Sequence, residues 1–537
     1  MPRAPMYSRP VLLLPCLNDV GSMRVLAQIT RPPAPPSLPV QQPAGRPAPG
    51  GRLAQNIGWL GLGQAFTWTM TLAWTLFVPR LIGPRGMGLI VMAASISGMV
   101  VGLAGLGSRP MLVKEIAADA SRAPQLLTTA LIVRGVLALP CTGLTALYVH
   151  LAGFHGAEAV AIYLGAAMAV LTLLSEVMQA GLQALERMGY LAASDVAGRG
   201  LQAGTAIPAA LAGVGAIWLV GAQVGVTALV TGLNLAWGRR FGADWRLDGA
   251  RFRSFLAGSL AYWAYALFFT FYLWIDATML ALMTPQQVVG WYGVPTRIFQ
   301  TLMFLPVIFS TAWLPRLAAA HQRGPDQLKI AARMPIELVT VLSLPVAAGL
   351  ALVARPLTLR LYGPAYEASI PVLEILALTL APMYLNIIVN QVLVAGNRQG
   401  VWTKAMVLAS IVNPAMNLLL IRYFQEHDGN GAIGAALSML GTEVLIAALG
   451  VWVIRAHVDL RMLWRIGRGA AATAAMAVVA WFATPLGLTA EVTAGGVTFA
   501  TCAVLLRVLS REELAELARL AGSMPVLSRL RRRWLAA

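Results

Sequence analysis

The side chains of this sequence best suited to chemistry are charged residues inside long apolar runs. Charged groups are costly in the apolar part of a membrane, so they usually face a cavity, a partner side chain or a transported substrate. A guanidinium group binds an anion through paired hydrogen bonds, and a buried carboxyl group can exchange a proton. The arginines of this kind are Arg134, Arg199 and Arg297, and the carboxylates are Glu176, Asp195, Asp276 and Glu443.

Four of these residues have two competing interpretations. Arg134, Glu176, Asp195 and Arg199 lie in the inner halves of three successive apolar runs. Arg134 and Arg199 either bind an anion or form structural pairs with the two carboxylates. Asp195 and Arg199 are four residues apart, which places them on one face of a helix. The sequence leaves both interpretations open.

The remaining three residues belong to the second half of the chain. Asp276 and Arg297 lie in the outer halves of consecutive, antiparallel runs, so we expect them to meet. Their contact is either a pair whose carboxylate takes up a proton, or a static buried pair. Glu443 lies near the middle of its run, where a lone carboxylate suits a proton-coupled carrier. Alternatively, Glu443 only forms a hydrogen bond to a neighbouring helix.

The elements that carry these residues are fourteen apolar runs, most of them near the length that a helix needs to cross a bilayer. Hydrophobic residues make up 58% of the 537 residues, charged residues make up 12%, and the mean hydropathy is +0.70. We therefore predict an all-α polytopic membrane protein with about fourteen transmembrane helices. The predicted spans are 57–79, 88–107, 126–149, 157–181, 190–212, 214–237, 254–283, 289–312, 336–354, 367–395, 402–424, 430–454, 466–485 and 488–508.

The positive charges alternate between the gaps that separate these spans. If the N-terminus is cytoplasmic, the cytoplasmic gaps and both termini hold 32 of the 40 Lys and Arg residues, and the opposite gaps hold five. This bias predicts that both termini face the cytoplasm. It also accounts for the net charge of +18 without nucleic-acid binding, which we do not expect because the charges form no aromatic-interleaved patch.

No cofactor or metal is expected. The three cysteines and five histidines form no metal-ligand spacing, and they cannot build a disulfide framework.

The chain divides into five predicted parts. A leader rich in Pro, Gly and Arg is expected to be disordered, unless translation begins later, for example at Met23. The tail is expected to form a cytoplasmic amphipathic and basic segment. The predicted parts are the leader 1–52, an N-lobe 53–250, a C-lobe 251–457, two extra spans within 458–509 and the tail 510–537.

The two predicted lobes are related by an internal repeat of roughly 200 residues. Each copy has six spans, an even number, so the two copies enter the membrane from the same side and enclose a shared cavity. Three pairs of segments carry the repeat in the same order. They are 81–88 with 282–290, 182–189 with 393–400, and 213–216 with 432–435.

Spaced patterns over roughly residues 55–510 give the chain a resemblance to a known family. They include Phe77-Val78-Pro79-Arg80-Leu81-Ile82-Gly83-Pro84, Gly105-Leu106-Gly107 with Lys114-Glu115-Ile116-Ala117, Ile275-Asp276, Gly290-Trp291-Tyr292, Leu361-Tyr362-Gly363-Pro364-Ala365-Tyr366, the run 372–377, Asn413, Asn417 and the run 431–436. In these residues the chain resembles the polysaccharide-type (Wzx-like) flippases of the multidrug/oligosaccharidyl-lipid/polysaccharide exporter superfamily.

This resemblance implies two six-helix lobes and a transporter, not an enzyme. It implies movement of undecaprenyl diphosphate-linked oligosaccharide across the bacterial cytoplasmic membrane, by alternating access coupled to an ion gradient. The expected partners are the lipid-linked oligosaccharide, membrane lipids and polysaccharide polymerase or export machinery. The related peptidoglycan-precursor flippase has arginines in its first helix, whereas span 1 has none between Gly58 and Pro79, which argues against lipid II as the substrate.

For the site residues, we predict substrate binding by Arg134, Arg199 and Arg297, because the diphosphate is an anion. We predict ion coupling or gating by Asp276, Glu443 and Glu176. One alternative function is a multidrug/cation antiporter of the same superfamily, although its cavity would favour acidic residues. A less favoured alternative is a polysaccharide polymerase or ligase, which would need a large loop at the outer face.

Overall fold

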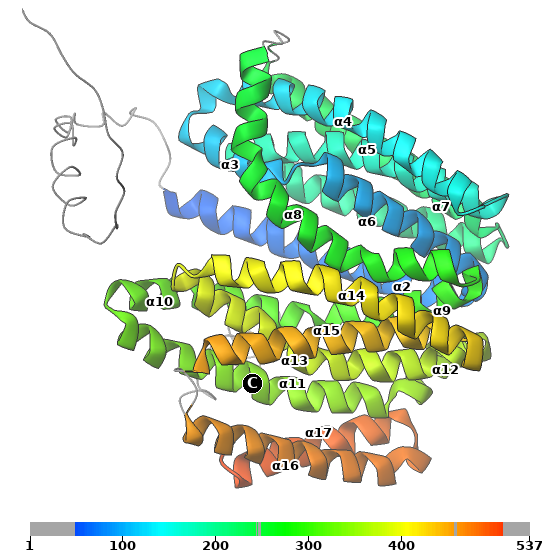
Figure 1. Cartoon of the computed structure of the whole chain (residues 1–537), viewed down its shortest axis with the longest axis vertical. Coiled ribbons are helices and arrows are strands. Elements are labelled where there is room, and N and C mark those ends of the chain that lie inside the picture. The colour runs from blue at the N-terminus through cyan, green and yellow to red at the C-terminus, as the bar shows by residue number, and fades with distance from the viewer. Residues whose placement is uncertain (1–48, 243, 245–248, 456–458, 509–537) are drawn as a thin grey trace, which may run out of the picture. The chain divides into compact units, whose positions relative to one another are not determined.

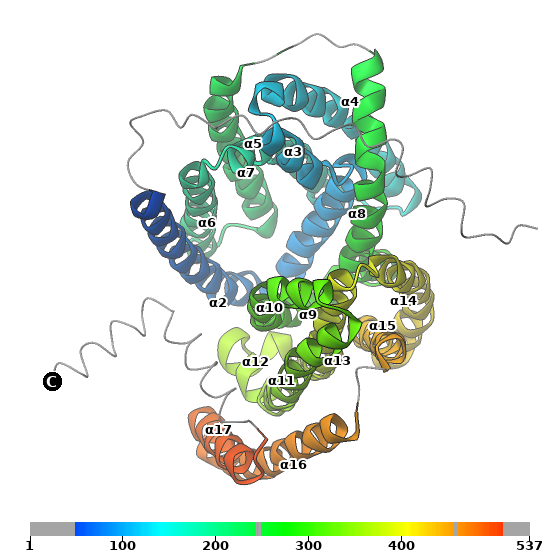
Figure 2. The same ribbon diagram turned by 90° about the vertical axis from the view of Figure 1, so that its left-hand side faces the viewer.

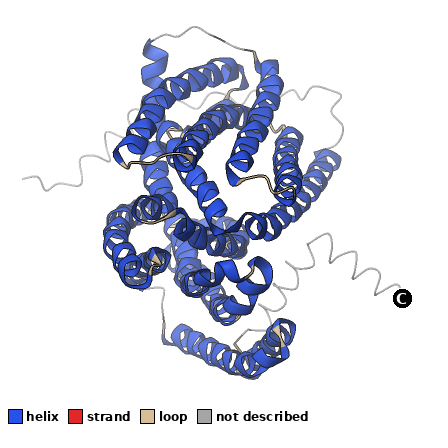
Figure 3. Ribbon diagram, turned by 90° about the vertical axis from the view of Figure 1, so that its right-hand side faces the viewer, coloured by secondary structure: helices blue, strands red, loops and turns tan. Residues whose placement is uncertain are grey.

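The computed structural model describes residues 49–242, 244, 249–455 and 459–508. Contacts divide the chain into two units, Met1–Gln55 and Asn56–Ala537. The described part of the second unit consists of helices and short connections and has no strand (Figure 3). The predicted tail 510–537 lies outside the described residues, and so does the predicted leader up to residue 48.

The helices follow one another closely along the chain. The α-helices are α2 (Pro49–Ala104), α3 (Ser108–Ala118), α4 (Ala123–Leu151), α5 (Ala157–Ala184), α6 (Met188–Leu211), α7 (Ala216–Gly238), α8 (Gly249–Met283), α9 (Gln286–Leu302), α10 (Phe304–Gln322), α11 (Pro325–Leu352), α12 (Ala354–Tyr362), α13 (Ile370–Ala395), α14 (Gln399–Asp428), α15 (Gly431–Val453), α16 (Leu460–Ala483) and α17 (Leu488–Leu505). Short 3₁₀ helices are η1 (Ala120–Arg122), η2 (Arg239–Phe241), η3 (Pro364–Ser369) and η5 (Thr484–Leu486).

Twelve helical segments of the described residues are long and apolar enough to cross a membrane, which agrees with the predicted all-α membrane fold. The predicted number of fourteen is not confirmed. One of the twelve, Phe66–Ala104, contains residues of two predicted spans, which α2 joins through a kink at Gly83. Helix α6 coincides with the predicted span 190–212 but is not among the twelve.

The kink in α2 has a local cause. Gly83 has φ 70° and ψ 175°, a left-handed conformation that glycine adopts without the steric cost of a Cβ atom. Pro84 follows and has no N–H to continue the helical hydrogen bonds. This turn is the first segment of the predicted repeat.

The second repeat segment has the same backbone in both copies. Glu186, after α5, and Asn397, after α13, have φ of 56° and 55°, which is uncommon for residues other than glycine. The amides of Arg187 and Arg398 each donate to the carbonyl five residues earlier, at 2.8 Å and 2.7 Å. Both helices therefore end in the same 6→1 motif, at equivalent positions of the repeat.

The helices gather in two groups. Figure 1 shows α4–α7 above α9–α15, and Figure 2 shows many of the same helices nearly end-on. Helices α4, α5, α6 and α7 pack on one another, as do α11, α13, α14 and α15. Helix α8 contacts both groups, because it packs on α3 and α4 as well as on α14 and α15. We call the first group, with α3 and with α2 from Asn56 onward, the first bundle, and we call α8–α15 the second bundle.

Helices α16 and α17 lie beside α11, at the outer side of the second bundle (Figure 2). The carboxylate of Glu337 in α11 is 3% exposed and accepts hydrogen bonds from Arg333 at 2.7 Å and from Arg465 of α16 at 2.5 Å. Arg465 also donates to the carbonyl of Val508 at 2.7 Å. The two predicted extra spans are therefore fixed to the second bundle by charged hydrogen bonds.

Candidate functional site

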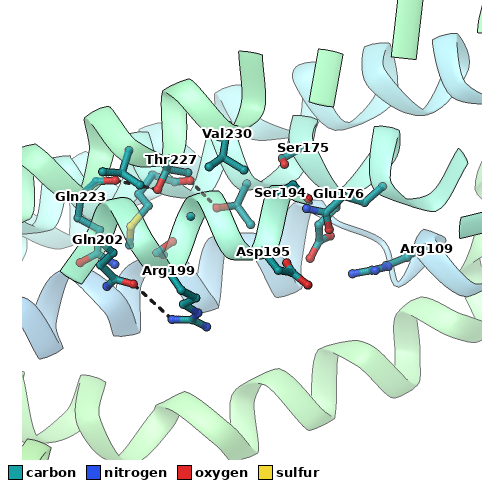
Figure 4. Close-up of a pocket in the computed structure, with 16 residues that line it drawn as sticks. Arg109, Ser175, Glu176, Ser194, Asp195, Arg199, Gln202, Gln223, Thr227 and Val230 are labelled. Carbon is teal, nitrogen blue, oxygen red and sulfur yellow. Dashed lines mark hydrogen bonds between the residues drawn. The ribbon is translucent and has the colours of Figure 1, made fainter. Parts of the chain in front are cut away.

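A polar cavity of about 320 Å³ lies in the first bundle, between α2, α3, α5, α6 and α7. Its charged and amide side chains come from four of these helices. They are Arg109, Glu176, Gln179, Asp195, Arg199, Gln202 and Gln223. Figure 4 shows Gln202, Arg199, Asp195 and Arg109 in a row along one side of the cavity.

The cavity reaches about halfway along the bundle. Arg109 lies at the end predicted to be cytoplasmic, in the first turn of α3, whereas Arg199 lies eleven residues after the start of α6. At 1.5 Å per residue, Arg199 is about 16 Å from that end of the helix. The cavity therefore places a guanidinium group near the middle of the predicted membrane.

Arg134 lies behind the wall of this cavity and is 1% exposed. Its Nε and Nη2 atoms donate to Ser108 Oγ at 3.2 Å and 3.0 Å, and its Nη1 atom donates to the carbonyl of Leu173 at 2.9 Å and to Glu176 at 3.1 Å. The alternative prediction of an Arg134–Glu176 pair is thus confirmed. Every nitrogen of this guanidinium group already has a partner, and the group orients Glu176, which is 26% exposed, at the cavity wall.

Arg199 has the opposite environment. Its side chain is exposed, lines the cavity and donates one hydrogen bond to Gln202 at 3.3 Å. The predicted alternative of a structural Arg199–Asp195 pair is not formed, because no ion pair within 4.0 Å joins them in the described structure. Arg199 is therefore available to an anion that enters the cavity.

Arg297, on α9 of the second bundle, lies against an aromatic ring of α2. Its guanidinium carbon lies 4.2 Å from the centroid of the Trp74 ring. Trp74 lines a small void together with Gln202 and Gln223, which also line the polar cavity. The like charges of Arg199 and Arg297 are close enough to act on each other. Two of the three predicted substrate-binding arginines thus approach the same space.

The prediction that Asp276 meets Arg297 is wrong. Asp276 is 6% exposed and accepts hydrogen bonds from Asn417 of α14 at 2.6 Å and from Tyr292 of α9 at 3.2 Å. Asn417 also donates to Asn413 at 3.0 Å. Helices α8 and α9 are adjacent, as predicted, but their faces differ: Asp276 faces α14, whereas Arg297 faces Trp74 of α2.

Glu443 lies between α13 and α15 and is 2% exposed. Asn386 of α13 donates to its carboxylate at 2.6 Å and to its backbone carbonyl at 3.0 Å. The hydrogen bond to a neighbouring helix that the sequence offered as an alternative is therefore present.

Four charged or amide residues that line the cavity were not predicted from the sequence: Arg109, Gln179, Gln202 and Gln223. Arg109 falls in a predicted cytoplasmic gap, because the predicted span ends at residue 107. The glutamines carry no charge, so a search for charged residues passed over them. Three amides inside apolar runs are nevertheless a signal that the sequence contains, since polar side chains in spans tend to face cavities.

The end of the bundles that is predicted to be periplasmic is closed by a reciprocal contact. A Cβ atom on Gly88 of α2 would overlap the carbonyl oxygen of Gln286, and a Cβ atom on Gly290 of α9 would overlap the carbonyl oxygen of Pro84. Gly88 lies four residues after Pro84, and Gly290 lies four residues after Gln286. The two halves of the contact are therefore equivalent in the repeat. We call this contact the glycine clasp.

Two hydrogen bonds accompany the glycine clasp. Tyr366 of η3 donates to the carbonyl of Pro79 at 2.9 Å, and its side chain is fully buried. Gln286 donates to Glu158, at the start of α5, at 2.7 Å. At this end the backbones of the two bundles thus touch, whereas the cavity lies toward the other end.

The Arg134–Glu176 pair allows a prediction about folding. Arg134→Ala will lower the amount of protein in the membrane, because Glu176 and Ser108 lose their partner. Removing one partner of a buried ion pair destabilises a soluble protein by about 3–5 kcal/mol. The cost is smaller here because Glu176 is 26% exposed. The double variant Arg134→Met/Glu176→Gln will recover abundance, as judged by immunoblotting of membranes. Equal abundance of wild type and Arg134→Ala would contradict a structural role.

Comparison with known proteins agrees with this architecture. Residues 53–321, half of the chain, match the family described as polysaccharide biosynthesis protein. A search of curated protein sequences gives no significant match.

Solved structures share the fold at low sequence identity. The structure of the lipid II flippase MurJ in an inward closed conformation is 11% identical, with a TM-score of 0.67 over 84% of this chain and 99% of MurJ. An inward-facing multidrug resistance MATE family transporter of the MOP superfamily is 16% identical, with a TM-score of 0.59 over 73% of this chain and 95% of that protein. These similar proteins are transporters, not enzymes. The chain belongs to the polysaccharide biosynthesis protein family and is a multi-pass membrane protein whose fold is similar to the folds of the flippase MurJ and of a MATE family transporter of the MOP superfamily.

Proposed function

We propose that this protein moves lipid-linked oligosaccharide of the undecaprenyl diphosphate type across the bacterial cytoplasmic membrane for surface polysaccharide synthesis. The observation that supports this proposal best is the exposed guanidinium group of Arg199 in a polar cavity, approached by Arg297 from the second bundle. A diphosphate carries its charge on several oxygens, which planar guanidinium groups bind in pairs.

The balance of charge in the cavity favours an anionic substrate. Arg109 and Arg199 line it, and Arg297 approaches it from Trp74. Of the two carboxylates that line it, Glu176 is paired with Arg134 from behind. The side-chain amides of Gln179, Gln202 and Gln223 provide neutral donors and acceptors, which suit sugar hydroxyl groups.

Alternating access explains why the bundles touch at one end while the cavity lies toward the other end. The substrate diphosphate enters the cavity from the cytoplasmic end, while the glycine clasp keeps the periplasmic end closed. Binding between Arg199 and Arg297 draws the two bundles together and screens the repulsion between their charges. Separation of the clasp then opens the same site to the periplasm. The orientation, with both termini in the cytoplasm, is the one that the charge bias predicts.

We also propose that Asp276 couples transport to an ion gradient. Asp276, Asn413 and Asn417 bring oxygen atoms from α8 and α14 together, and the side-chain oxygen of Asn417 is buried and accepts no hydrogen bond within the described structure. Carboxylate and amide oxygens suit a small cation, and the carboxylate alone suits a proton. Glu443, which is held by Asn386, is the second candidate for this role.

Asp276→Asn will remove the dependence of transport on the ion gradient while leaving membrane abundance close to wild type, because an amide keeps the shape of the side chain. Transport is measured in proteoliposomes with an imposed sodium or proton gradient. The matched control is Glu426→Gln, which removes an exposed carboxylate of α14. Gradient dependence that survives in Asp276→Asn would exclude this residue from coupling.

Deletion of the gene tests the substrate class. The deletion strain will lose its surface polymer and keep its susceptibility to cationic drugs. Normal polymer together with increased sensitivity to cationic dyes would instead support the multidrug/cation antiporter. An antiporter would need acidic groups in the cavity, and Asp195 is the one cavity carboxylate without an ion pair in the described structure.

A further inference from the structure

A second cavity, of about 490 Å³, lies between α3, the start of α4 and the first half of α8, and it shares no lining residue with the cavity described above. The apolar segment of α8 begins at Tyr262, and the other lining residues of α8 lie between Ala250 and Gly258, before that segment. Arg122 lies just before α4. The cavity therefore lies at the end of these helices that is predicted to be cytoplasmic.

Three cations line this cavity, each from a different element: Lys114 from α3, Arg122 from η1 and Arg251 from α8. Two of them are paired with carboxylates, and one of these carboxylates, Glu115, also lines the cavity. Arg122 binds Glu115 at 2.9 Å, and Arg251 binds Asp244 at 2.7 Å. Lys114 is exposed and forms no ion pair within 4.0 Å in the described part of the chain.

The rest of the lining is amphipathic. Gln125, Thr129 and Ser254 add neutral hydrogen-bonding groups, whereas Met111, Leu126, Phe255 and Tyr262 add an apolar surface. Met111 and Phe255 are themselves buried, at 7% and 4% exposed, so this surface is part of the packed protein. A ligand that matches the whole cavity has an anionic end and an apolar end.

We propose that this cavity binds an anionic phospholipid of the cytoplasmic leaflet, with the lipid phosphate near Lys114 and Arg251 and the glycerol and first acyl carbons on the apolar side. Basic cavities between membrane helices at this face bind anionic head groups, and the leaflet supplies such lipids at high local concentration. Free phosphate would match the cations but would leave the apolar side without a partner. The bound lipid contacts α3 and α4 of the first bundle and α8 of the second.

The proposal is tested by titrating the purified full-length protein with phosphatidylglycerol and counting bound lipids by native mass spectrometry. Lys114→Gln/Arg251→Gln will weaken the tightest lipid-binding event by about fivefold for each cation lost. The matched control Lys404→Gln/Arg398→Gln removes one lysine and one arginine from outside the cavity and will bind like wild type. Phosphatidylcholine will bind all of these proteins equally weakly.

Lys114→Gln alone provides a second variant, because Lys114 is exposed and its loss breaks no ion pair of the described structure. It will weaken phosphatidylglycerol binding by about fivefold without changing the melting temperature. Unchanged lipid affinity in Lys114→Gln, or an equal loss in the Lys404→Gln/Arg398→Gln control, would overturn the proposal. Displacement of the lipid by millimolar inorganic phosphate would also overturn it, because the cavity would then be a site for free anions.

Discussion

Arg199→Ala will abolish surface polymer while leaving the amount of protein in the membrane unchanged. The guanidinium group of Arg199 is exposed to the cavity and makes one hydrogen bond, to Gln202, so its removal leaves no buried partner unpaired. Charge-assisted hydrogen bonds contribute about 1.5–3 kcal/mol each, so losing one contact to the diphosphate weakens binding roughly 10- to 150-fold. Surface polymer and membrane abundance are measured in the same cells.

Two further variants separate binding from folding. Arg199→Lys will restore transport only in part, because an ammonium group keeps the charge but lacks the planar pair of donors. Arg134→Ala serves as the contrasting variant, since its loss lowers abundance first. If Arg199→Ala reduced abundance and transport in parallel, Arg199 would have a structural role and the proposed diphosphate contact would be wrong.

Gly88→Ala and Gly290→Ala will each prevent closure of the periplasmic end and stop transport. The added methyl carbon would lie only 2.0 Å (Gly88) or 1.9 Å (Gly290) from a carbonyl oxygen of the opposite bundle, and backbone atoms cannot move aside as a flexible side chain can. Overpacking of this kind costs about 1–3 kcal/mol, which shifts an equilibrium between two states roughly 5- to 150-fold. The shift favours the state that is open to the periplasm.

Accessibility of a cavity residue measures this shift. Gln223 lines the polar cavity of the first bundle and the small void beside Trp74. Gln223→Cys, in a protein whose other cysteines are replaced, therefore reports whether a membrane-impermeant thiol reagent reaches the polar cavity from outside. Labelling will rise in the Gly88→Ala and Gly290→Ala proteins. Gly143→Ala is the control, because a Cβ atom there meets nothing within 4 Å. Unchanged labelling with normal transport would show that the glycine clasp has no role in closure.

The parts of the fold that the sequence predicted are those set by local pattern. Apolar runs predicted the helices, and the repeat paired segment 182–189 with 393–400, where Glu186 and Asn397 have the same backbone conformation. The number of spans was harder to predict, because α2 continues through its kink at Gly83 and α6 carries polar residues of the cavity wall.

The candidate site could be predicted only where one helix or two neighbouring helices decide the contact. The Arg134–Glu176 pair was anticipated because α4 and α5 are consecutive. Asp276 could not be assigned to Asn417, because its partner lies 141 residues away and adjacency in sequence does not fix which way a helix face turns. Likewise, the contact of Arg297 with Trp74 joins the two bundles, and no local pattern encodes such a contact.

The distribution of lipid-linked oligosaccharide between the two leaflets tests the central claim most directly. In spheroplasts depleted of this protein, an impermeant reagent that modifies the glycan will reach almost none of the lipid-linked oligosaccharide, and expression of the wild-type chain will restore access. Expression of Arg199→Ala at equal abundance will not restore it. If the glycan remained accessible from outside after depletion, the protein would not be the flippase for this substrate.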